Sequence, residues 1–581
     1  MAKPLFNTFE LRTFVTFILA SALIVGCTDE DDTPGVETSY SDASDSQTPL
    51  FTEISKSIGL ANFSHITGAE GKMWLPETMS GAGGVLDYDL DGWPDVVLVR
   101  GARWENNDVP TLALYKNTAQ KSFVETTNEA GLQNVRAFPM GVAIGDYDND
   151  GDPDIFLTAV ETNMLFRNDD GVFQEVGAQA GIADEKLWST ASMWIDADRD
   201  GWLDLFVGNY VEWAPDMYDY CTADGKLKSY CTPELYNGVP VNFYRNNGDG
   251  TFSNWSEKSG FAQSQGKTLG AAALDVNDDG WLDVVLANDT QRDELYINNG
   301  DGTFTEKGVV SGVAFDENGK ARAGMGIETG VVDNQGRETI FVGNFAGEMI
   351  GVYRQTQGEF FADRAAASRI GRSSLRTLTF GMVLFDAELD GDLDLFTANG
   401  HITEQSEKAA QNAVTYRQPP HLFLNDGSGK FTDAAPDFEA MQVRAVGRGA
   451  ATIDFDRDGD FDLMLGENGG PVYFFENHAA NSGAHFLKVF VQGVTSNRDG
   501  YGTTLIAAVG AKKLHRRIRS GSSYLSHSES VALFGLGEAT KADSLTVKWP
   551  TGEVQVFREI EADSEYKLVE GGNLEIVREV R

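Results

Sequence analysis

The sequence contains few cysteines, few histidines and few basic residues. Only 3 Cys and 7 His occur in 581 residues, and 46 Lys+Arg stand against 88 Asp+Glu, which gives a net charge of −42. This balance excludes nucleic acid as a partner, because phosphates require basic residues. The motifs G-x-S-x-G and H-E-x-x-H do not occur, and the scattered histidines indicate no catalytic set. We therefore predict no catalytic residues.

The only long apolar run lies near the N-terminus and is too short to span a bilayer comfortably. It covers residues 14–25, follows Lys3 and Arg12, and ends shortly before Cys27. Such a run predicts a signal peptide. The small residues before Cys27 are similar to the lipobox of bacterial lipoproteins, which implies that Cys27 is lipidated. An ordinary signal peptide with an incidental cysteine is the alternative.

These features predict the N-terminal organisation and the location of the protein. Residues 1–27 are expected to be a lipoprotein signal peptide. Residues 28–50 are rich in Asp, Ser and Thr, which predicts a flexible acidic tether. The protein is then exported and anchored by lipid to the bacterial outer membrane or cell surface. The other two cysteines, Cys221 and Cys231, predict a disulfide in an oxidising compartment, with two free thiols as the alternative.

An acidic loop of the pattern D-x-D-x-D-G-x-x-D recurs along the chain. Six intact copies and one degenerate copy start at positions 87, 146, 196, 275, 331, 386 and 454. We number them loops 1 to 7. Short apolar runs flank each loop, and turns such as N-N-G-D-G follow, as expected for short strands joined by hairpins. The spacing fits one four-stranded sheet in each repeat.

A second count concerns the tail Phe-x-Glu or Phe-x-Asp that ends each repeat. It follows every loop except the last, yet a matching tail, Phe51-Thr52-Glu53, precedes loop 1. Seven loops and seven tails offset by one predict a ring in which the N-terminal strand completes the last sheet. The fold class is therefore all-β, with a seven-bladed β-propeller over residues 51–480. An open β-solenoid is the alternative.

The intact loops have the ligand pattern of a calcium site. Carboxylates at positions 1, 3 and 5 converge, Gly at position 6 allows the turn, position 7 offers a carbonyl, and position 9 adds a carboxylate. About six Ca²⁺ are expected, and the fifth loop, which keeps only Asp333, is expected to bind none. A purely structural acidic turn is the alternative. The predicted ligands are Asp87, Asp89, Asp91, Trp93, Asp95, Asp146, Asp148, Asp150, Asp152, Asp154, Asp196, Asp198, Asp200, Trp202, Asp204, Asp275, Asn277, Asp279, Trp281, Asp283, Asp386, Glu388, Asp390, Asp392, Asp394, Asp454, Asp456, Asp458, Asp460 and Asp462.

The repeat phrases resemble FG-GAP/VCBS repeats, which implies a propeller of the integrin α-subunit kind. After the repeats, four phrases at residues 497–502, 520–526, 534–537 and 547–552 are similar to the ASPIC/UnbV domain. Together, the repeats and this domain resemble bacterial relatives of cartilage acidic protein. The resemblance to this family implies an architecture more than an activity. Residues 481–581 alternate apolar and polar side chains and predict a small β-sandwich or barrel. Its basic cluster at residues 512–519 is either a solvated hairpin face or a docking surface for the acidic propeller or an anionic glycan.

The resemblance also implies that partners bind on the face opposite the acidic loops. The residue five past the last Asp of each loop marks the far end of the second strand. Polar residues at these positions, with His401 nearby, form the predicted ligand rim: Arg100, Asn209, Asn288, Asn344, Asn399, His401 and Glu467. The alternative is that these Asn side chains cap a turn and need no ligand. An insertion over residues 212–239, with Trp213 and the Cys pair, offers aromatic binding anchors.

Two functions from different classes remain open on the sequence alone. The leading prediction is a surface-anchored, calcium-binding propeller for adhesion to, or recognition of, a protein or glycan partner. In this case the membrane is reached only through the N-terminal lipid. The alternative is a polysaccharide-acting enzyme, a lyase or hydrolase, in which His401, Arg100 and Glu467 would be the candidate groups at the rim.

Overall fold

The computed structural model describes residues 50–581 except 106, 183–185, 216, 218–220, 223–225, 227, 265, 406 and 408–412. The chain divides into two compact units, Met1–Gln47 and Thr48–Arg581, and the second is described here. The predicted signal peptide, the lipidation of Cys27 and nearly all of the tether lie outside the described residues. Among the residues that are described, no helix has the length and apolar character needed to cross a membrane.

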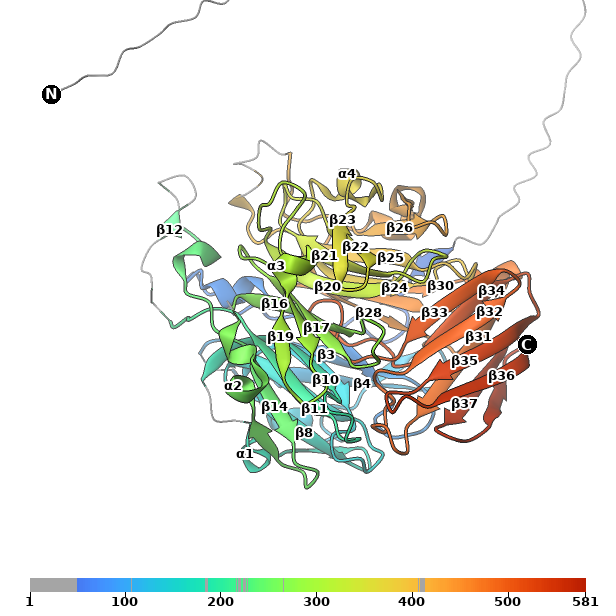
Figure 1. Cartoon of the computed structure of the whole chain (residues 1–581). Helices are drawn as coiled ribbons and strands as arrows, with labels where there is room; N and C mark the ends of the chain where they lie inside the picture. Colours follow the sequence, from blue (N-terminus) through green and yellow to red (C-terminus); the bar gives the residue numbers. More distant parts are fainter. Residues whose placement is uncertain are drawn as a thin grey trace, which may run out of the picture. The chain divides into compact units, whose positions relative to one another are not determined.

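Seven groups of four antiparallel strands occupy most of the chain (Figure 1). We call them repeats 1 to 7. The strands of repeats 1 to 4 are β2 (Gly83–Leu86), β3 (Asp95–Val99), β4 (Leu112–Asn117), β5 (Phe123–Glu125); β6 (Phe138–Gly145), β7 (Asp154–Glu161), β8 (Met164–Asp169), β9 (Val172–Glu175); β10 (Leu187–Ile195), β11 (Asp204–Asn209), β14 (Asn242–Asn246), β15 (Phe252–Asn254); and β16 (Thr268–Leu274), β17 (Asp283–Asn288), β18 (Glu294–Asn298), β19 (Phe304–Glu306). Repeats 2 and 3 share one larger sheet because β10 also pairs with β7.

The remaining repeats follow the same order, and the last one uses the N-terminal strand. Their strands are β20 (Gly324–Val331), β21 (Glu338–Asn344), β22 (Gly351–Gln357), β23 (Phe360–Asp363); β24 (Thr379–Phe385), β25 (Asp394–Asn399), β26 (His421–Asn425), β27 (Phe431–Asp433); and β28 (Gly447–Ile453), β29 (Asp462–Glu467), β30 (Val472–Asn477), β1 (Phe51–Glu53). Strand β1 pairs with β30, with Phe51 opposite Asn477. The prediction that the N-terminal strand completes the last sheet is confirmed.

Helices are few and short. The α-helices whose bounds lie within the described residues are α1 (Gly177–Ala180), α2 (Ser256–Ser259), α3 (Gly308–Ser311) and α4 (Ile370–Ser374). The 3₁₀ segments are η1 (Leu75–Thr78), η2 (Leu132–Asn134), η3 (Pro233–Leu235), η4 (Phe261–Gln263), η5 (Ala435–Asp437), η6 (Glu439–Gln442) and η7 (Ala479–Ser482). Two further short strands, β12 (Cys221–Thr222) and β13 (Lys228–Ser229), pair within the insertion between β11 and β14.

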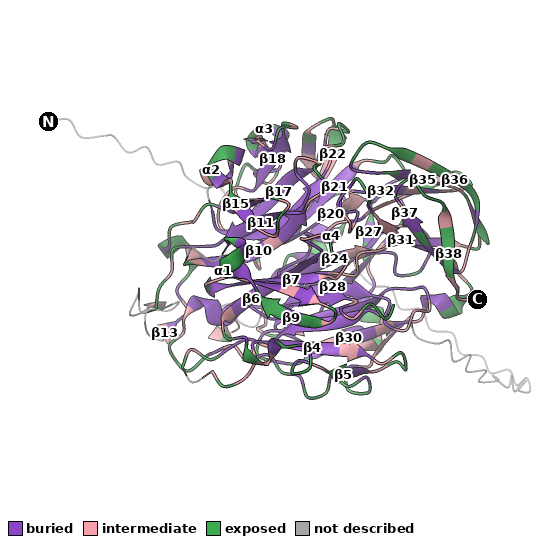
Figure 2. Ribbon diagram, turned by 90° about the horizontal axis from the view of Figure 1, so that it is seen from below, coloured by how far each residue is buried: buried purple, intermediate pink, exposed green. Residues whose placement is uncertain are grey.

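The core lies between neighbouring repeats. Second strands such as β3 are buried along their whole length, because the sheets cover each other on both faces, so an apolar run replaces alternation. Figure 2 shows this burial across the propeller strands. One apolar cluster joins Val96 of repeat 1 to Ile453 and Met464 of repeat 7, which closes the ring. The fold is a β-propeller, and the seven-bladed interpretation depends on this pairing and closure.

The C-terminal region forms a small β domain of two four-stranded sheets. One sheet has the order β34 (Ala532–Gly537), β31 (His485–Gln492), β37 (Ser564–Val569), β38 (Leu574–Glu579). The other has the order β33 (Lys512–Arg517), β32 (Thr504–Val509), β35 (Lys541–Lys548), β36 (Val554–Glu561). Strands β31 and β37 are parallel, and the other pairs are antiparallel. The sandwich-like prediction for this region is confirmed.

The segment between β33 and β34 enters the propeller. His527 N–H donates to Gly83 O, and His527 O accepts from Val85 N–H, both at 3.0 Å. Ser523 O accepts from Ile327 N–H at 2.9 Å. Further contacts reach the first strands of the other repeats at Val142, Trp194, Ala271, Met382 and Thr452. Residues 520–529 therefore lie between the first strands of all repeats and occupy the axis of the propeller.

The basic cluster of the C-terminal domain docks on the propeller. Arg517 pairs with Glu338 at 2.6 Å, Lys512 pairs with Asp392 at 3.1 Å, and Arg519 pairs with Glu328. These contacts favour the docking alternative over a solvated hairpin face.

Candidate functional site

In five of the six intact loops, the carboxylate at position 1 accepts the N–H of the Gly at position 6. In loop 1, Asp87 accepts the N–H groups of Asp91 at 3.0 Å and Gly92 at 2.8 Å. Position 4 has a positive φ, 55° at Leu90, and Gly92 follows with φ 86°. The positive φ angles at positions 4 and 6 turn the chain tightly enough for the side chains at positions 1, 3 and 5 to face one another. The other intact loops repeat the positive φ at positions 4 and 6.

Carboxylate oxygens come together in four of the loops. In each of these groups, three carboxylates offer oxygen atoms that all lie within 4.8 Å of one another. The groups are Asp87, Asp89, Asp95; Asp146, Asp148, Asp154; Asp196, Asp198, Asp200; and Asp454, Asp456, Asp458. Like charges this close repel strongly unless a cation or a proton lies between them.

Several of these oxygens are buried and lack any hydrogen-bond partner among the described residues. The unpaired oxygens belong to loops 1, 2, 3, 4 and 7, and they are Oδ1 of Asp89, Asp146, Asp148, Asp196, Asp198, Asp275, Asp454 and Asp460. A buried carboxylate oxygen without a partner is costly, because it has lost its hydration and gained nothing in return. Oxygen atoms of carboxylates and amides are the donors that Ca²⁺ prefers, so the residues of these five loops fit the ion. Loops 1, 2, 3 and 7 gather three carboxylates each, and loop 4 offers Asp275 with Asn277 and Asp279.

Burial and mutual repulsion raise the pKa values of the loop carboxyl groups. Burial, with neighbouring carboxylates adding to it, raises the pKa of Asp87 to about 6 and that of Asp196 to about 7. The pKa of Asp146 rises to about 8, chiefly through burial and then through Asp499 and Asp150. The fold thus holds groups that resist ionisation unless positive charge is supplied.

The carboxylate at position 9 has a different task from the others. Asp283 accepts two backbone N–H groups, from Val276 at 2.9 Å and from Asn298 at 2.8 Å. The same pair of contacts occurs at Asp95, Asp154, Asp204, Asp394 and Asp462. Position 9 therefore ties the acidic loop to the third strand of its own repeat, and in loops 1 and 2 it also joins the oxygen cluster.

An asparagine at the end of the third strand links neighbouring repeats, and the sequence analysis missed it. The Asn298 side-chain N–H₂ donates to Ala197 O of the preceding repeat at 2.9 Å and to Leu282 O at 3.2 Å. Equivalent contacts are made by Asn117, Asn168, Asn246, Asn425 and Asn477. The recurrence of Asn at the last or next-to-last position of the third strand was the available signal.

In loop 6 the C-terminal domain satisfies the carboxylate at position 1 with a backbone N–H and an arginine. Asp386 accepts Gly535 N–H at 3.0 Å, and the Arg516 guanidinium lies 3.4 Å from the same oxygen. Glu388, at position 3, is exposed. Within the described residues this loop has no buried carboxylate oxygen without a partner. Its predicted ligands Asp386, Glu388, Asp390, Asp392 and Asp394 are present but are not gathered around an unpaired oxygen.

The degenerate fifth loop has Val331, Gln335 and Thr339 at positions 1, 5 and 9, where the intact loops have carboxylates. Asp333 pairs with Arg337 at 2.7 Å and lies 3.9 Å from Arg354. Gln355 replaces the linking asparagine and donates to Val276 O of the preceding repeat at 2.6 Å. Asp333, the only carboxylate at a ligand position of this loop, is thus neutralised by guanidinium groups. The link between repeats persists without an acidic cluster.

The predicted ligand rim requires a correction. Asn209, Asn288, Asn344 and Asn399 end the second strands as expected, but all are buried, with at most 2% of the residue surface exposed. Each donates its side-chain N–H₂ to a backbone carbonyl of the following connection, for example Asn399 to Pro419 O at 2.9 Å. These residues therefore hold turns and present no surface to a ligand, as the capping alternative required.

The other rim residues are also committed to internal contacts. Glu467 is buried and pairs with Arg417 at 2.6 Å, and Arg100 pairs with Glu125 at 2.6 Å. Burial lowers the pKa of His401 to about 4, so its imidazole is neutral at pH 7. His401, Arg100 and Glu467 thus have separate partners or surroundings, and the structure does not assemble them into one constellation.

Aromatic side chains gather instead near the predicted insertion. Trp74, Trp104 and Trp213 are each partly exposed, and their ring centroids lie 5.0, 5.4 and 5.9 Å apart. Phe138 stacks on Trp104 at 3.8 Å, and buried Trp188 lies 6.0 Å from Trp213. We call the three tryptophans the tryptophan cluster. Three separate segments build it, and only Trp213 was foreseen from the sequence.

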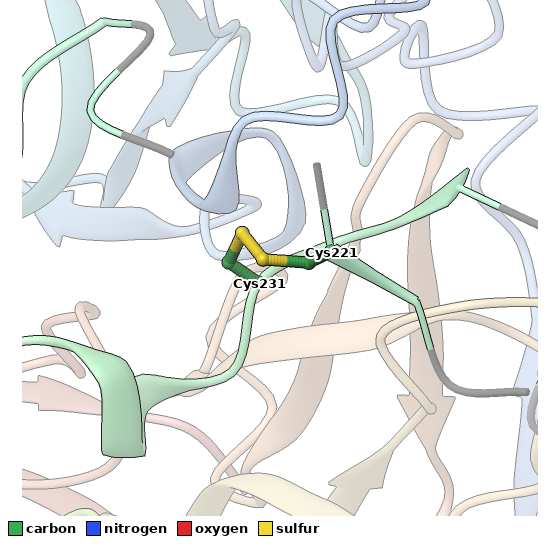
Figure 3. The surroundings of a disulfide bond; sticks show 2 residues. All are labelled: Cys221 and Cys231. Carbon is green, nitrogen blue, oxygen red and sulfur yellow. A yellow bond between two sulfur atoms is a disulfide. The ribbon is translucent and has the colours of Figure 1, made fainter. Parts of the chain in front are cut away.

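The insertion that carries Trp213 is fixed by a disulfide. Cys221, at the start of β12, is bonded to Cys231 with a Cα–Cα distance of 5.1 Å (Figure 3). Cys231 is buried in the same apolar core as Trp188. Tyr230 OH donates to Glu77 at 3.2 Å. Glu77 lies in η1, the 3₁₀ segment that begins directly after Trp74. The disulfide prediction is confirmed, and the bond holds the insertion against the segment that carries Trp74.

Comparison with known families defines the class of protein. The family described as FG-GAP-like repeat matches residues 87–157, 146–207, 222–286 and 275–327. The family described as ASPIC and UnbV matches residues 493–575. The chain is therefore a β-propeller protein that combines FG-GAP-like repeats with a C-terminal ASPIC and UnbV domain.

The chain is homologous to cartilage acidic protein 1. It is 24% identical to the human protein over 545 residues, which covers 87% of this chain and 73% of that protein. It is 25% identical to the Xenopus tropicalis protein over 448 residues, covering 73% and 63%. It is 23% identical to the Mus musculus protein over 561 residues, covering 90% and 77%. The predicted combination of FG-GAP-like repeats with a C-terminal ASPIC/UnbV domain is confirmed.

Several solved structures match this chain only weakly. An Agrocybe aegerita lectin that recognises non-reducing terminal N-acetylglucosamine matches with TM-score 0.37 and 16% identity, covering 61% of this chain and 79% of that chain. YCF48 bound to D1 peptide matches with TM-score 0.37 and 9% identity, covering 68% and 92%. The exotype rhamnogalacturonan lyase YesX matches with TM-score 0.29 and 13% identity, covering 72% and 65%. These scores are too low for any ligand or activity to be transferred.

Proposed function

We propose that this protein is a calcium-stabilised recognition propeller that binds a protein or glycan partner through the tryptophan cluster. An FG-GAP propeller fits protein interaction or recognition in general. The observation that supports this binding surface is the contact of Trp74, Trp104 and Trp213, all partly exposed and drawn from three segments. Large aromatic rings at a fixed spacing are typical anchors of binding surfaces.

Calcium has the role of holding the scaffold. The unpaired oxygens of loops 1, 2, 3, 4 and 7 support five sites. Loops 1, 3 and 7 keep such oxygens although Lys116, Arg245 and Lys488 pair with other carboxylate oxygens there. Within the described residues, the predicted ligands of loops 5 and 6 keep none. A bound ion would neutralise each cluster and close the turn between the first and second strands. The sixth ion expected from the sequence is therefore not part of this proposal.

The proposal also includes export and lipid anchoring through Cys27. The motif before Cys27 and the acidic segment after it support this location, and the Cys221–Cys231 disulfide is consistent with an oxidising compartment. The replacement Cys27→Ser is expected to move the protein from the membrane fraction to the soluble fraction. Retention of the variant in the membrane fraction would contradict lipid anchoring at this residue.

A glycan and protein array tests the recognition surface. The wild-type chain in calcium buffer is expected to bind a partner that Trp104→Ala weakens at least tenfold, which is about 1.4 kcal/mol. Phe360→Ala is the matched control, because Phe360 is 52% exposed and lies outside the cluster. A partner whose affinity is unchanged by replacement of any of the three tryptophans would contradict the proposal.

No specific observation favours the enzyme alternative, since His401, Arg100 and Glu467 are separately committed. A product assay on each glycan that binds distinguishes the two functions. Binding without a new product supports recognition, whereas turnover supports the polysaccharide-acting enzyme.

A further inference from the structure

The fifth repeat carries a basic pocket in a strongly acidic protein. Four basic side chains line it, Arg337, Arg354, Arg364 and Lys430, together with Ser368 and the turn at Ser428 and Gly429. Arg337 comes from the degenerate loop, Arg354 from β22, and Lys430 from the turn between β26 and β27 of the next repeat. The pocket therefore lies between two repeats, beside the one loop that has lost its acidic pattern.

Nearby acids do not balance the positive charge. Asp333 pairs with Arg337 and Arg354. Asp426 is the other acid whose charge acts on Arg354, and its Oδ1 already accepts the N–H and hydroxyl of Ser428. Arg364 and Lys430 are exposed and form no ion pair with any residue that the structure describes. Four cations thus face two carboxylates, in a chain whose net charge is −42.

Arg354 is fixed in place with one donor left over. Its two terminal groups donate to Ser428 O at 3.3 Å and Gly429 O at 2.8 Å. Its Nε–H is buried and has no acceptor among the described residues. A Cβ at Gly429 would collide with the guanidinium, so the turn needs glycine there to approach so closely. Holding an arginine against like charges and leaving a donor unused is costly unless an anion completes the site.

We propose that this pocket binds one small oxyanion group, such as a sulfate, phosphate or carboxylate. Guanidinium groups recognise such groups through paired charge-assisted hydrogen bonds. A long polyanion is disfavoured, because beyond a Debye length of about 8 Å the remaining surface is acidic and repels it. The site is separate from the tryptophan cluster and from the calcium loops, so it does not depend on the proposed function.

Calorimetric titration of the full chain with sodium sulfate, at constant ionic strength in calcium buffer, tests the pocket. Saturable binding to one site is expected. Arg364→Ala and Lys430→Ala should each weaken it about tenfold. Both side chains are exposed, so the melting temperature should not change. Arg372→Ala is the matched control, since Arg372 is an exposed arginine outside the pocket.

Three outcomes would overturn the proposal. The first is the absence of saturable sulfate binding by the wild-type chain. The second is an equal loss of affinity in Arg372→Ala and Arg364→Ala, which would indicate only a general charge effect. The third comes from a highly sulfated polysaccharide, tested in parallel. Binding more than about tenfold tighter than sulfate would show a polyanion surface instead of a site for one group.

Discussion

Loop 2 and the degenerate fifth loop occupy equivalent positions in their repeats, but they differ in how the negative charge of their carboxylates is balanced. Loop 2 gathers Asp146, Asp148 and Asp154 and leaves buried oxygens without partners. The fifth loop keeps Asp333 alone and pairs it with Arg337 from the same turn. The comparison teaches that the turn itself does not need a metal. In the proposed account, the acidic loops need positive charge, which an ion or a basic side chain supplies.

Removal of calcium is expected to have the largest effect on this comparison. Each occupied site stabilises the folded state by about 2.7 kcal/mol when free calcium is 100 times its dissociation constant, and five separate sites add approximately. The melting temperature should therefore fall markedly in chelator, and the loss should be reversed by calcium. Magnesium at equal concentration is the control, because it prefers octahedral geometry and holds its water. An unchanged melting temperature would contradict the role of the acidic loops.

A matched pair of variants separates the two loops. Asp148→Asn should lower stability in calcium and have little or opposite effect in chelator, because it removes one ligand and one repelling charge. Asp333→Asn should cost about 1–3 kcal/mol in both conditions, since it leaves Arg337 and Arg354 without their carboxylate. Thermal unfolding of both variants, with and without calcium, measures the difference. Equal changes in the stability of the two variants on addition of calcium would contradict the proposed difference between the two loops.

The stability of the calcium-free protein should depend on pH, because the carboxyl groups of the acidic loops lie close together. The pKa values of Asp87, Asp196 and Asp146 are raised to about 6, 7 and 8 in the folded chain. The folded state then binds more protons than the unfolded state between about pH 4 and 8, so stability falls as pH rises through these values. In calcium the trend should weaken or reverse, because the ion replaces the protons. Melting curves from pH 5 to 8 in both conditions provide the measurement.

The contacts between repeats should give the smallest effect, and it should not depend on calcium. Asn298→Ala removes the donors to Ala197 O and Leu282 O, which is expected to cost about 1–3 kcal/mol. Gln355→Ala in the fifth repeat should cost a similar amount, because Gln355 donates to Val276 O in the same way. Denaturant unfolding of the two variants compares them. A much larger effect for Asn298, lost in chelator, would show that the link depends on the ion.

The repeat pattern predicted the strands, the acidic loops and the closing strand, because all of these depend on local periodicity. The pairing of Phe51 with Asn477 followed from a tail that was displaced in the sequence. The position-9 carboxylates were foreseen as ligands, but their hydrogen bonds to the third strand were not. Those contacts depend on the depth at which each strand packs, which residue spacing alone does not fix.

Contacts between distant segments could not be predicted. Arg516 contacts Asp386, which lies 130 residues earlier in the sequence. His527, in the C-terminal domain, forms a hydrogen bond with Gly83, in the first repeat of the propeller. The tryptophan cluster joins Trp104 to Trp213 in the same way. The rim asparagines were placed at the correct strand ends, but the pattern of polar residues could not reveal that each side chain turns inward to a carbonyl.

The number of calcium ions bound by the whole chain tests the central claim most directly. Equilibrium dialysis of the chelator-treated protein against calcium, with the metal measured by atomic absorption, gives this number. The account predicts five ions in the wild-type chain, four in Asp148→Asn and five in Asp333→Asn. A wild-type chain that binds none, or a loss of one ion in Asp333→Asn, would contradict the account.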